Sequence, residues 1–232
     1  MEILYEDNHI IVVSKPQGVA SQPDETGDKD ILTQVKEYIK EKYNKPGEAF
    51  VGLVHRLDRP TGGAMVFAKT SKAASRLSEQ MRNGDFDKTY LAVVCGKPRE
   101  SKAKIVSYLK KDEKTNTALI VPQTTTGAKR AELDYEVLAY NQDTDHSLVK
   151  VKIYSGRGHQ IRVQMKSIKC PIFGDQKYGG ENMDKVHLNL FATELKFAHP
   201  TTKDIMVFRA YPPEEKSAWN KFNLEKYLSL KV

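Results

Sequence analysis

The sequence predicts an α+β protein built on a largely antiparallel, mixed sheet that is flanked by helices. Segments with the two-residue period of a strand arrive in runs, most clearly between residues 88 and 155. Segments with helical periodicity are inserted among them at irregular intervals, without the strict strand–helix alternation of a parallel sheet. We therefore expect one domain over residues 1–232, in which two subdomains would divide near residues 119–130.

Short strands and two helices are expected in the first part of the chain. Asp7 and Asn8 form a turn between the first two strands, and Pro16 and Gly18 follow the second. Asp30 is placed to cap a helix whose apolar residues recur at helical spacing. The expected elements are strands within 3–14, a helix over 31–43, strands over 52–54 and 64–68, and a helix over 71–82.

The rest of the chain is expected to be mainly strand. Ala131, Leu133, Tyr135, Val137 and Ala139 alternate with polar residues, which is typical of a strand with one buried face. The expected strands cover 88–97, 104–111, 117–122, 130–140, 147–155, 188–197 and 205–213; helices are expected within 156–168 and over 213–222.

Composition places the chain among ordinary globular proteins. Of its 232 residues 39% are hydrophobic and 29% are charged, and no apolar run approaches the length of a membrane-spanning helix. Two cysteines and an acidic N-terminus without a signal peptide favour a cytosolic location. Residues 97–169 contain 15 Lys and Arg against 8 Asp and Glu, so the net charge of +7 lies there. This excess predicts either a polyanion-binding surface or a solvated lysine-rich face.

Asp58 is the first candidate for chemistry, because it lies between Arg56 and Arg59 at the end of a predicted strand. Neighbouring arginines would favour its ionised form. The following Gly62 and Gly63 would let the backbone approach a ligand closely. A structural ion pair at a strand end is the alternative interpretation.

The segment SGRGHQIRVQM, residues 155–165, is the second candidate. Two glycines flank Arg157 just before a predicted helix, whose N-terminus could bind a phosphate. Arg162 would lie in the first turn of that helix and could reach a carboxylate, or it could be an ordinary surface arginine. Tyr90 is either a core residue or a platform on which a base stacks. The histidines lack the spacing of a zinc site, so no metal is expected.

Five ordered motifs together resemble the RluA family of RNA pseudouridine synthases, almost from end to end. They are EDNHIIVVSKPQGVASQP, HRLDRPTGG, KTYLAVVCG, GRGHQIRVQM with CPIFGDQKYG, and ELKFAHPTTKDIMVFRAYPP. The resemblance implies the pseudouridine synthase fold and places Asp58, Tyr90 and Arg162 as catalytic residues, with Arg162 paired to Asp58. It implies substrate contacts from His55, Arg56, Arg59, Thr61, Gly62, Gly63, Arg157, His159 and Gln160.

The resemblance also implies isomerisation of specific uridines in structured RNA, rRNA or tRNA, by a monomeric enzyme without a metal or other cofactor and without a membrane partner. Gly62 and Gly158 depart from the family pattern, which usually has hydroxyl residues there. We expect no separate S4-type RNA-binding domain. The choice between covalent attack by the aspartate and a glycal pathway stays open. Two other readings are a non-catalytic RNA-binding module and an aspartate-dependent glycoside hydrolase.

Overall fold

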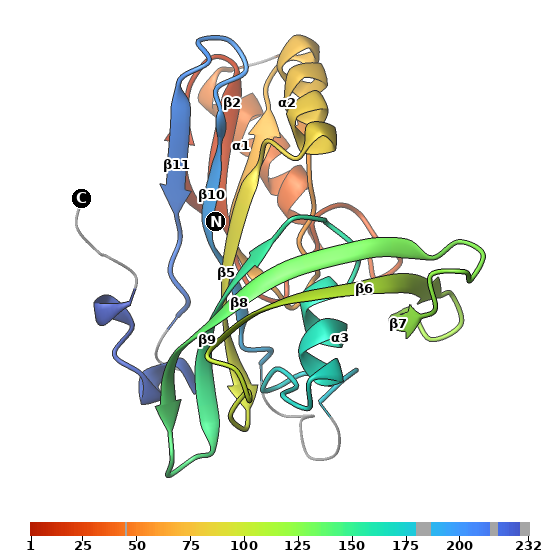
Figure 1. Cartoon of the computed structure of the whole chain (residues 1–232). Coiled ribbons are helices and arrows are strands. Elements are labelled where there is room, and N and C mark those ends of the chain that lie inside the picture. Colours follow the sequence, from red (N-terminus) through yellow and green to blue (C-terminus); the bar gives the residue numbers. More distant parts are fainter. Residues whose placement is uncertain (45, 180–186, 214–217, 228–232) are drawn as a thin grey trace. The chain divides into compact units, whose positions relative to one another are not determined.

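The structure is a computed structural model that describes residues 1–232 except 45, 180–186, 214–217 and 228–232 (Figure 1). Its described residues form eleven strands of a mixed, mostly antiparallel sheet together with three α-helices, so the predicted α+β class is confirmed. The chain divides into two compact units. The first contains residues 1–88 and 192–211, and the second contains residues 89–191 and 212–232.

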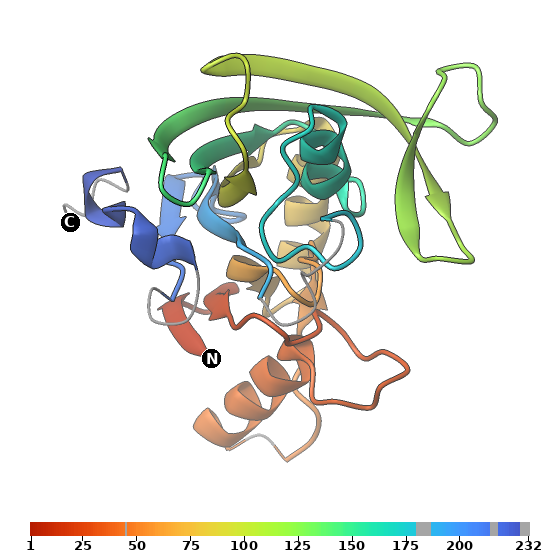
Figure 2. The same ribbon diagram turned by 90° about the horizontal axis from the view of Figure 1, so that it is seen from below.

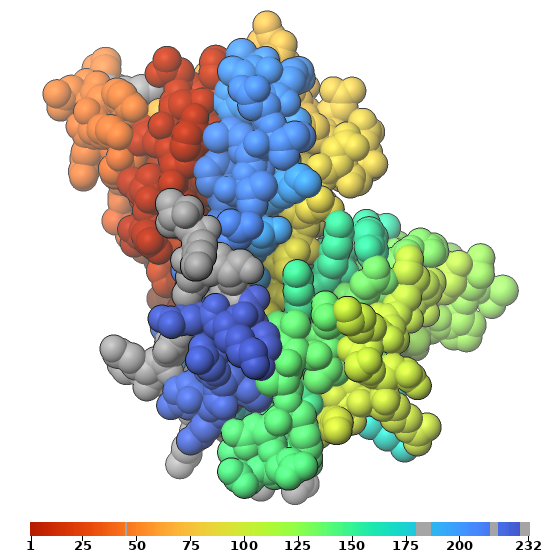
Figure 3. Space-filling view, turned by 60° about the vertical axis from the view of Figure 1, so that its left-hand side comes forward, coloured from red at the N-terminus to blue at the C-terminus, as the bar shows by residue number. Residues whose placement is uncertain are grey.

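The first unit contains a strand that is buried along its whole length. All seven residues of β4 are buried, as expected for a central strand without polar side chains. The centre of the Tyr5 ring lies 5.5 Å from the centre of the Phe208 ring. The two segments that carry these residues lie side by side on one face (Figure 3). The strands are β1 (Glu2–Glu6), β2 (Ile10–Lys15), β3 (Gly52–Leu53), β4 (Gly62–Ala68), β10 (Leu190–Ala198) and β11 (Ile205–Arg209), with antiparallel pairs β1–β2, β2–β4, β3–β4 and β10–β11.

Both predicted helices of this unit are present, as α1 (Ile31–Lys42) and α2 (Ser71–Asn83). Asp30 caps α1 by accepting a hydrogen bond from the backbone N–H of Thr33 at 3.0 Å, as the sequence predicts. Helix α2 packs so closely on β3 that a Cβ on Gly52 would lie 2.9 Å from the Ala74 Cβ. The glycine therefore sets the distance between this helix and the sheet.

The second unit contains a long antiparallel sheet with α3 (Gln160–Ser167) on one face (Figure 2). Gln164 of α3 is buried, and its Nε2 donates to Ser107 Oγ at 2.9 Å. The strands of this sheet lie in the order β5-β9-β8-β6-β7; they are β5 (Asp87–Cys95), β6 (Lys102–Asp112), β7 (Thr117–Val121), β8 (Lys129–Asn141) and β9 (His146–Ile153). One buried apolar cluster includes Val163 of α3, three residues of the sheet and a residue that follows the helix; its members are Leu109, Ala118, Ala131, Val163 and Tyr178.

The predicted alternation in β8 holds for Ala131, Leu133 and Tyr135, which are buried. Val137 and Ala139 are only half-buried, because a register shift between them interrupts the pairing with β9. Residues 119–130, where the sequence suggested a division, lie inside the second unit.

The predicted closing helix is only partly described. Residues 214–217 lie outside the described residues, and Ala218–Lys221 and Leu224–Lys226 form short 3₁₀ helices. Of the helices that are described, none has the length and apolar character needed to cross a membrane.

Candidate active site

Asp58 lies in the connection between β3 and β4, in a half-buried position. The backbone around it is fixed by hydrogen bonds to four consecutive carbonyl groups. Most of the donors come from the segment that follows β2, so the KPQG stretch fixes the backbone of the HRLD stretch. The bonds are Ser21 Oγ to Leu57 O at 2.6 Å, Thr61 N to Asp58 O at 2.9 Å, Lys15 Nζ and Gly18 N to Arg59 O at 3.2 and 2.9 Å, and Gln17 Nε2 to Pro60 O at 3.0 Å.

Lys15 is the centre of this arrangement. Its side chain is fully buried, and Nζ also donates to the carbonyls of Pro16 at 3.0 Å and Val19 at 2.6 Å. Burial lowers the pKa of the Lys15 ammonium to about 7, and the negative charge of Asp58 opposes part of that decrease. Lys15 thus connects the end of β2 to the Asp58 turn.

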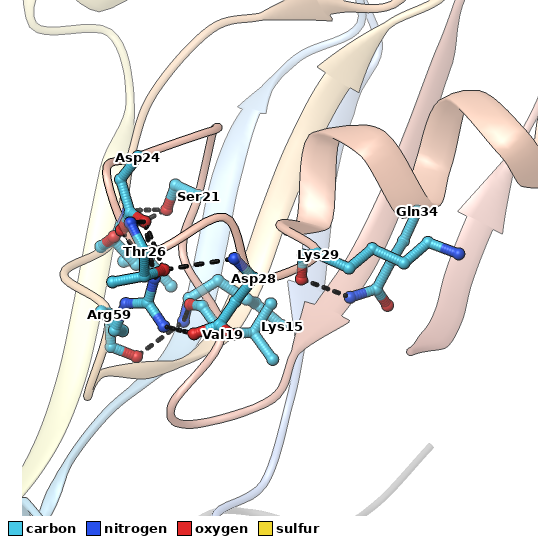
Figure 4. Close-up of polar contacts among 10 residues, drawn as sticks. Lys15, Val19, Ser21, Asp24, Thr26, Asp28, Lys29, Gln34 and Arg59 are labelled. Atoms are coloured by element: carbon cyan, nitrogen blue, oxygen red, sulfur yellow. Dashed lines mark hydrogen bonds and ion pairs between the residues drawn. The ribbon is translucent and has the colours of Figure 1, made fainter.

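Arg59 does not pair with Asp58, contrary to the interpretation of Asp58 as a carboxylate held by arginines on both sides. Its guanidinium binds Asp24 through Nη2 at 2.7 and 2.8 Å and Asp28 through Nη1 at 2.8 Å (Figure 4). The hydrogen bonds from Arg59 and Thr26 lower the pKa of Asp24 to about 2. Arg56 is exposed, and in the part of the chain that the structure describes it makes no ion pair. The side chain of Arg59 therefore orders the loop 24–28.

His55 is held as a neutral ring. Its Nε2 accepts a hydrogen bond from the backbone N–H of Val66 at 3.1 Å. Burial, together with the nearby positive charge of Lys88, lowers the pKa of His55 to about 3. His55 is predicted to contact the substrate, and in the structure its ring forms a hydrogen bond with β4.

Gly63 lets the backbone of a neighbouring strand, rather than a ligand, approach closely. Its φ is +126°, and a Cβ there would lie 2.2 Å from the carbonyl oxygen of Ala192 on β10. The sequence had suggested that this glycine makes room for a ligand. The neighbouring Thr61 and Gly62 are also buried.

Arg162 lies in the first turn of α3, as predicted, and its side chain is buried. Its guanidinium forms two hydrogen bonds with Asp175, from Nε to Oδ2 at 2.8 Å and from Nη2 to Oδ1 at 2.7 Å. Sequence reasoning missed Asp175. A buried arginine requires an anionic partner, and the GDQKYG stretch that follows the helix supplies it. Tyr90 is buried in β5.

The segment before α3 is ordered by Gln160. Its Oε1 accepts from Ser155 Oγ at 2.8 Å and from the Arg157 N–H at 3.2 Å, and its Nε2 donates to Glu132 O at 3.0 Å. Arg157 Nε donates to the carbonyl of Arg130 at 3.1 Å.

The left-handed residue at the start of α3 is His159, with φ +55°, rather than either glycine that flanks Arg157. Its Nδ1 lies 3.0 Å from Tyr178 Oη. This geometry differs from the predicted glycine-rich phosphate loop, because the glycines do not supply the unusual backbone conformation.

The basic segment 97–169 is partly neutralised on the surface of the second unit. Lys102 pairs with Glu136 at 2.7 Å across β6 and β8, and Lys104 pairs with Glu132 at 2.6 Å. Lys110 is exposed and makes no ion pair with the described residues. Both glutamates belong to the same segment and are already subtracted in its net charge, so these pairs leave the excess of positive charge unchanged.

The predicted site residues are divided between the two units. The ion pair between Asp58 of the first unit and Arg162 of the second stays a prediction. In the described part of the chain, no group of three His, Cys, Asp or Glu side chains is arranged to hold a metal ion. The first unit contains His55, Arg56, Asp58, Arg59, Thr61, Gly62 and Gly63, and the second contains Tyr90, Arg157, His159, Gln160 and Arg162.

Comparisons with known proteins give one consistent family. The sequence profile of the family described as RNA pseudouridylate synthase matches residues 9–167. The chain is 35% identical over 219 residues to the uncharacterized RNA pseudouridine synthase YhcT of Bacillus subtilis (strain 168), covering 94% of this chain and 70% of that protein. It is 30% identical over 230 residues to tRNA pseudouridine synthase C of Vibrio cholerae (serotype O1, strain El Tor Inaba N16961), covering 90% of each.

Among solved structures, human RNA pseudouridylate synthase domain containing 4 has the same fold. The TM-score is 0.78 at 22% sequence identity, and the match covers 100% of this chain and 94% of that one. The predicted pseudouridine synthase fold is therefore confirmed. The profile match and the sequence relatives agree with the ordered motifs around Asp58, Tyr90 and Arg162. The chain thus belongs to the RluA-type family of RNA pseudouridine synthases, and it is an RNA pseudouridine synthase, an isomerase.

Proposed function

We propose that this chain isomerises specific uridines of structured RNA, either ribosomal or transfer RNA, with Asp58 as the catalytic carboxylate. The observation that supports this assignment best is the fixed backbone from Leu57 to Pro60, where every carbonyl accepts a hydrogen bond. A carboxylate on such a turn has a restricted position. Restriction of a reacting group before the substrate binds removes part of the entropic barrier to reaction.

The reaction breaks the N1–C1′ bond of a uridine, rotates the released uracil and joins C5 to C1′. The hydrogen on C5 then leaves as a proton, and N1 takes up a proton. In this proposal Asp58 either attacks C1′ covalently or takes part in the glycal pathway. Tyr90 lies against the base of the substrate. Arg162 donates a hydrogen bond to Asp58 and orients it. The proposal needs this contact between the two units in the active enzyme.

The target uridine has to leave its stack before it can reach a pocket, which costs a few kcal/mol. Phosphate contacts from lysines of the β6–β9 sheet would offset that cost, because each neutralised phosphate releases counterions. Lys110 and Lys129 are exposed, and neither is paired with a carboxylate among the described residues, so they are the first candidates for such contacts.

Release of tritium from RNA labelled at C5 of uridine tests the proposal. Total rRNA and total tRNA, each free of this modification, are incubated separately with the purified protein. We expect tritium release from one of these pools. RNA binding without release would favour a binding module, and release of free uracil without tritium exchange would favour a hydrolase.

A further inference from the structure

The ion pair between Arg162 and Asp175 is buried, with side-chain exposures of 5% and 0%. Arg162 also lies in the first turn of α3, where the helix dipole disfavours a positive charge. Removing both charges from water costs several kcal/mol per ion, and pairing often does no more than offset that cost. Stability alone is therefore a weak reason for this pair.

The Asp175 carboxylate is fixed by the backbone. Oδ1 accepts hydrogen bonds from the N–H groups of Lys177 and Tyr178, both at 3.0 Å, in addition to the bond from Arg162. The Asp175 carbonyl accepts from the Gly179 N–H at 2.7 Å. Because the turn itself orients the carboxylate, Asp175 can impose one orientation on the guanidinium.

Tyr178 restrains the same guanidinium from its face. The Cζ of Arg162 lies 5.2 Å from the centre of the Tyr178 ring, within the range of a cation–π contact. The Tyr178 hydroxyl is fixed in turn, because it accepts from the Ala118 N–H at 2.6 Å and lies 3.0 Å from His159 Nδ1. Arg162 is thus restrained along one edge and over one face.

We propose that Asp175 is a positioning residue for the isomerisation, acting through Arg162. Asp175 binds the edge formed by Nε and Nη2, so that the direction of the remaining Nη1 is fixed. This inference rests on the proposed function, which makes Arg162 a catalytic group. It adds that the direction of the guanidinium, and not its charge alone, determines the rate.

Two substitutions test it by separating charge from direction. Asp175→Asn keeps the size of the side chain and removes the bidentate acceptor. Asp175→Glu keeps the charge but moves the carboxylate by one methylene. We expect each to lower kcat by about 10²-fold with little change in KM, the loss expected when a reacting group is misplaced by about 1 Å. A kcat for folded Asp175→Glu close to the wild-type value would overturn the proposal.

Glu194→Gln is the matched control, because Glu194 forms an exposed ion pair with Arg209 at 3.0 Å. It should leave kcat unchanged. Asp175→Asn leaves a buried arginine without its partner and can fail to fold, so urea unfolding is measured for every variant. If Asp175→Asn is unfolded, Asp175→Glu decides the question, because it retains the opposite charge.

A measurement without RNA distinguishes this inference from the proposed function. NMR of the Arg162 side chain should show slow rotation of the guanidinium in the wild type and fast rotation in Asp175→Glu. Fast rotation in the wild type would overturn the positioning role whatever the enzyme does to RNA. Slow rotation together with no tritium release from any RNA would instead contradict only the proposed function.

Discussion

Ser21 and Leu57 are joined by two hydrogen bonds, although 36 positions separate them. Ser21 Oγ donates to the Leu57 carbonyl at 2.6 Å and accepts from the Leu57 N–H at 3.0 Å. One buried hydroxyl thus satisfies both polar groups of the residue that precedes Asp58. The KPQGVAS segment therefore fixes the backbone of the Asp58 turn.

Ser21→Ala should therefore affect both stability and turnover. It leaves two buried backbone groups without their partner, at a cost of about 1–3 kcal/mol in the free energy of unfolding. The Asp58 turn should also become more mobile, so kcat should fall while KM stays similar. Urea unfolding and tritium release measure these effects, and Ser71→Ala at an exposed position of α2 is the control. Wild-type kcat in Ser21→Ala would show that this bond does not position Asp58.

His55 should make the stability depend on pH. Its pKa is about 3 in the folded protein and about 6.5 in the unfolded chain, so between these values only the unfolded chain binds the proton. The contribution of His55 to the free energy of unfolding is fully present above pH 6.5 and is lost as the pH falls toward 3. The loss should approach about 5 kcal/mol at pH 3.

His55→Gln isolates this contribution, because glutamine does not titrate and its carbonyl can accept from the Val66 N–H. The difference in unfolding free energy between the wild type and this variant should change with pH between 6.5 and 3. A difference that is constant over this range would mean that His55 is protonated in the folded protein.

Lys110 should contribute to the salt dependence of RNA affinity. If it contacts a phosphate, Lys110→Gln should weaken binding across RNA sequences and reduce the slope of log affinity against log salt by about 1. The control is Lys102→Gln combined with Glu136→Gln, which removes an ion pair on the same sheet without changing the net charge. Equal slopes for Lys110→Gln and the wild type would assign Lys110 to the solvated face.

Local patterns predicted most of the fold. The α1 helix, for example, follows from its apolar spacing and the Asp30 cap, both of which depend on neighbouring residues. The partial loss of alternation in β8 was not predictable, because the register shift depends on its pairing with β9. The 3₁₀ conformation of residues 218–221 was missed because an apolar pattern does not distinguish it from one turn of an α-helix.

The partners of charged side chains were harder to predict. Arg59 is adjacent to Asp58 in sequence but binds Asp24 and Asp28, because the loop returns toward it. Arg162 was identified from its motif, whereas its partner Asp175 is 13 positions away and becomes apparent only from the burial of both groups. Motifs thus indicated which residues matter, and the fold determined which residues they contact.

Tritium release by Asp58→Asn tests the central claim most directly. The substitution keeps the side-chain size and the backbone bonds of the turn, so only the carboxylate charge and its nucleophilic oxygen are lost. We predict that Asp58→Asn binds the RNA substrate with wild-type affinity and releases no tritium from C5-labelled uridine. Release at a rate close to that of the wild type would contradict the account and remove Asp58 from the reaction.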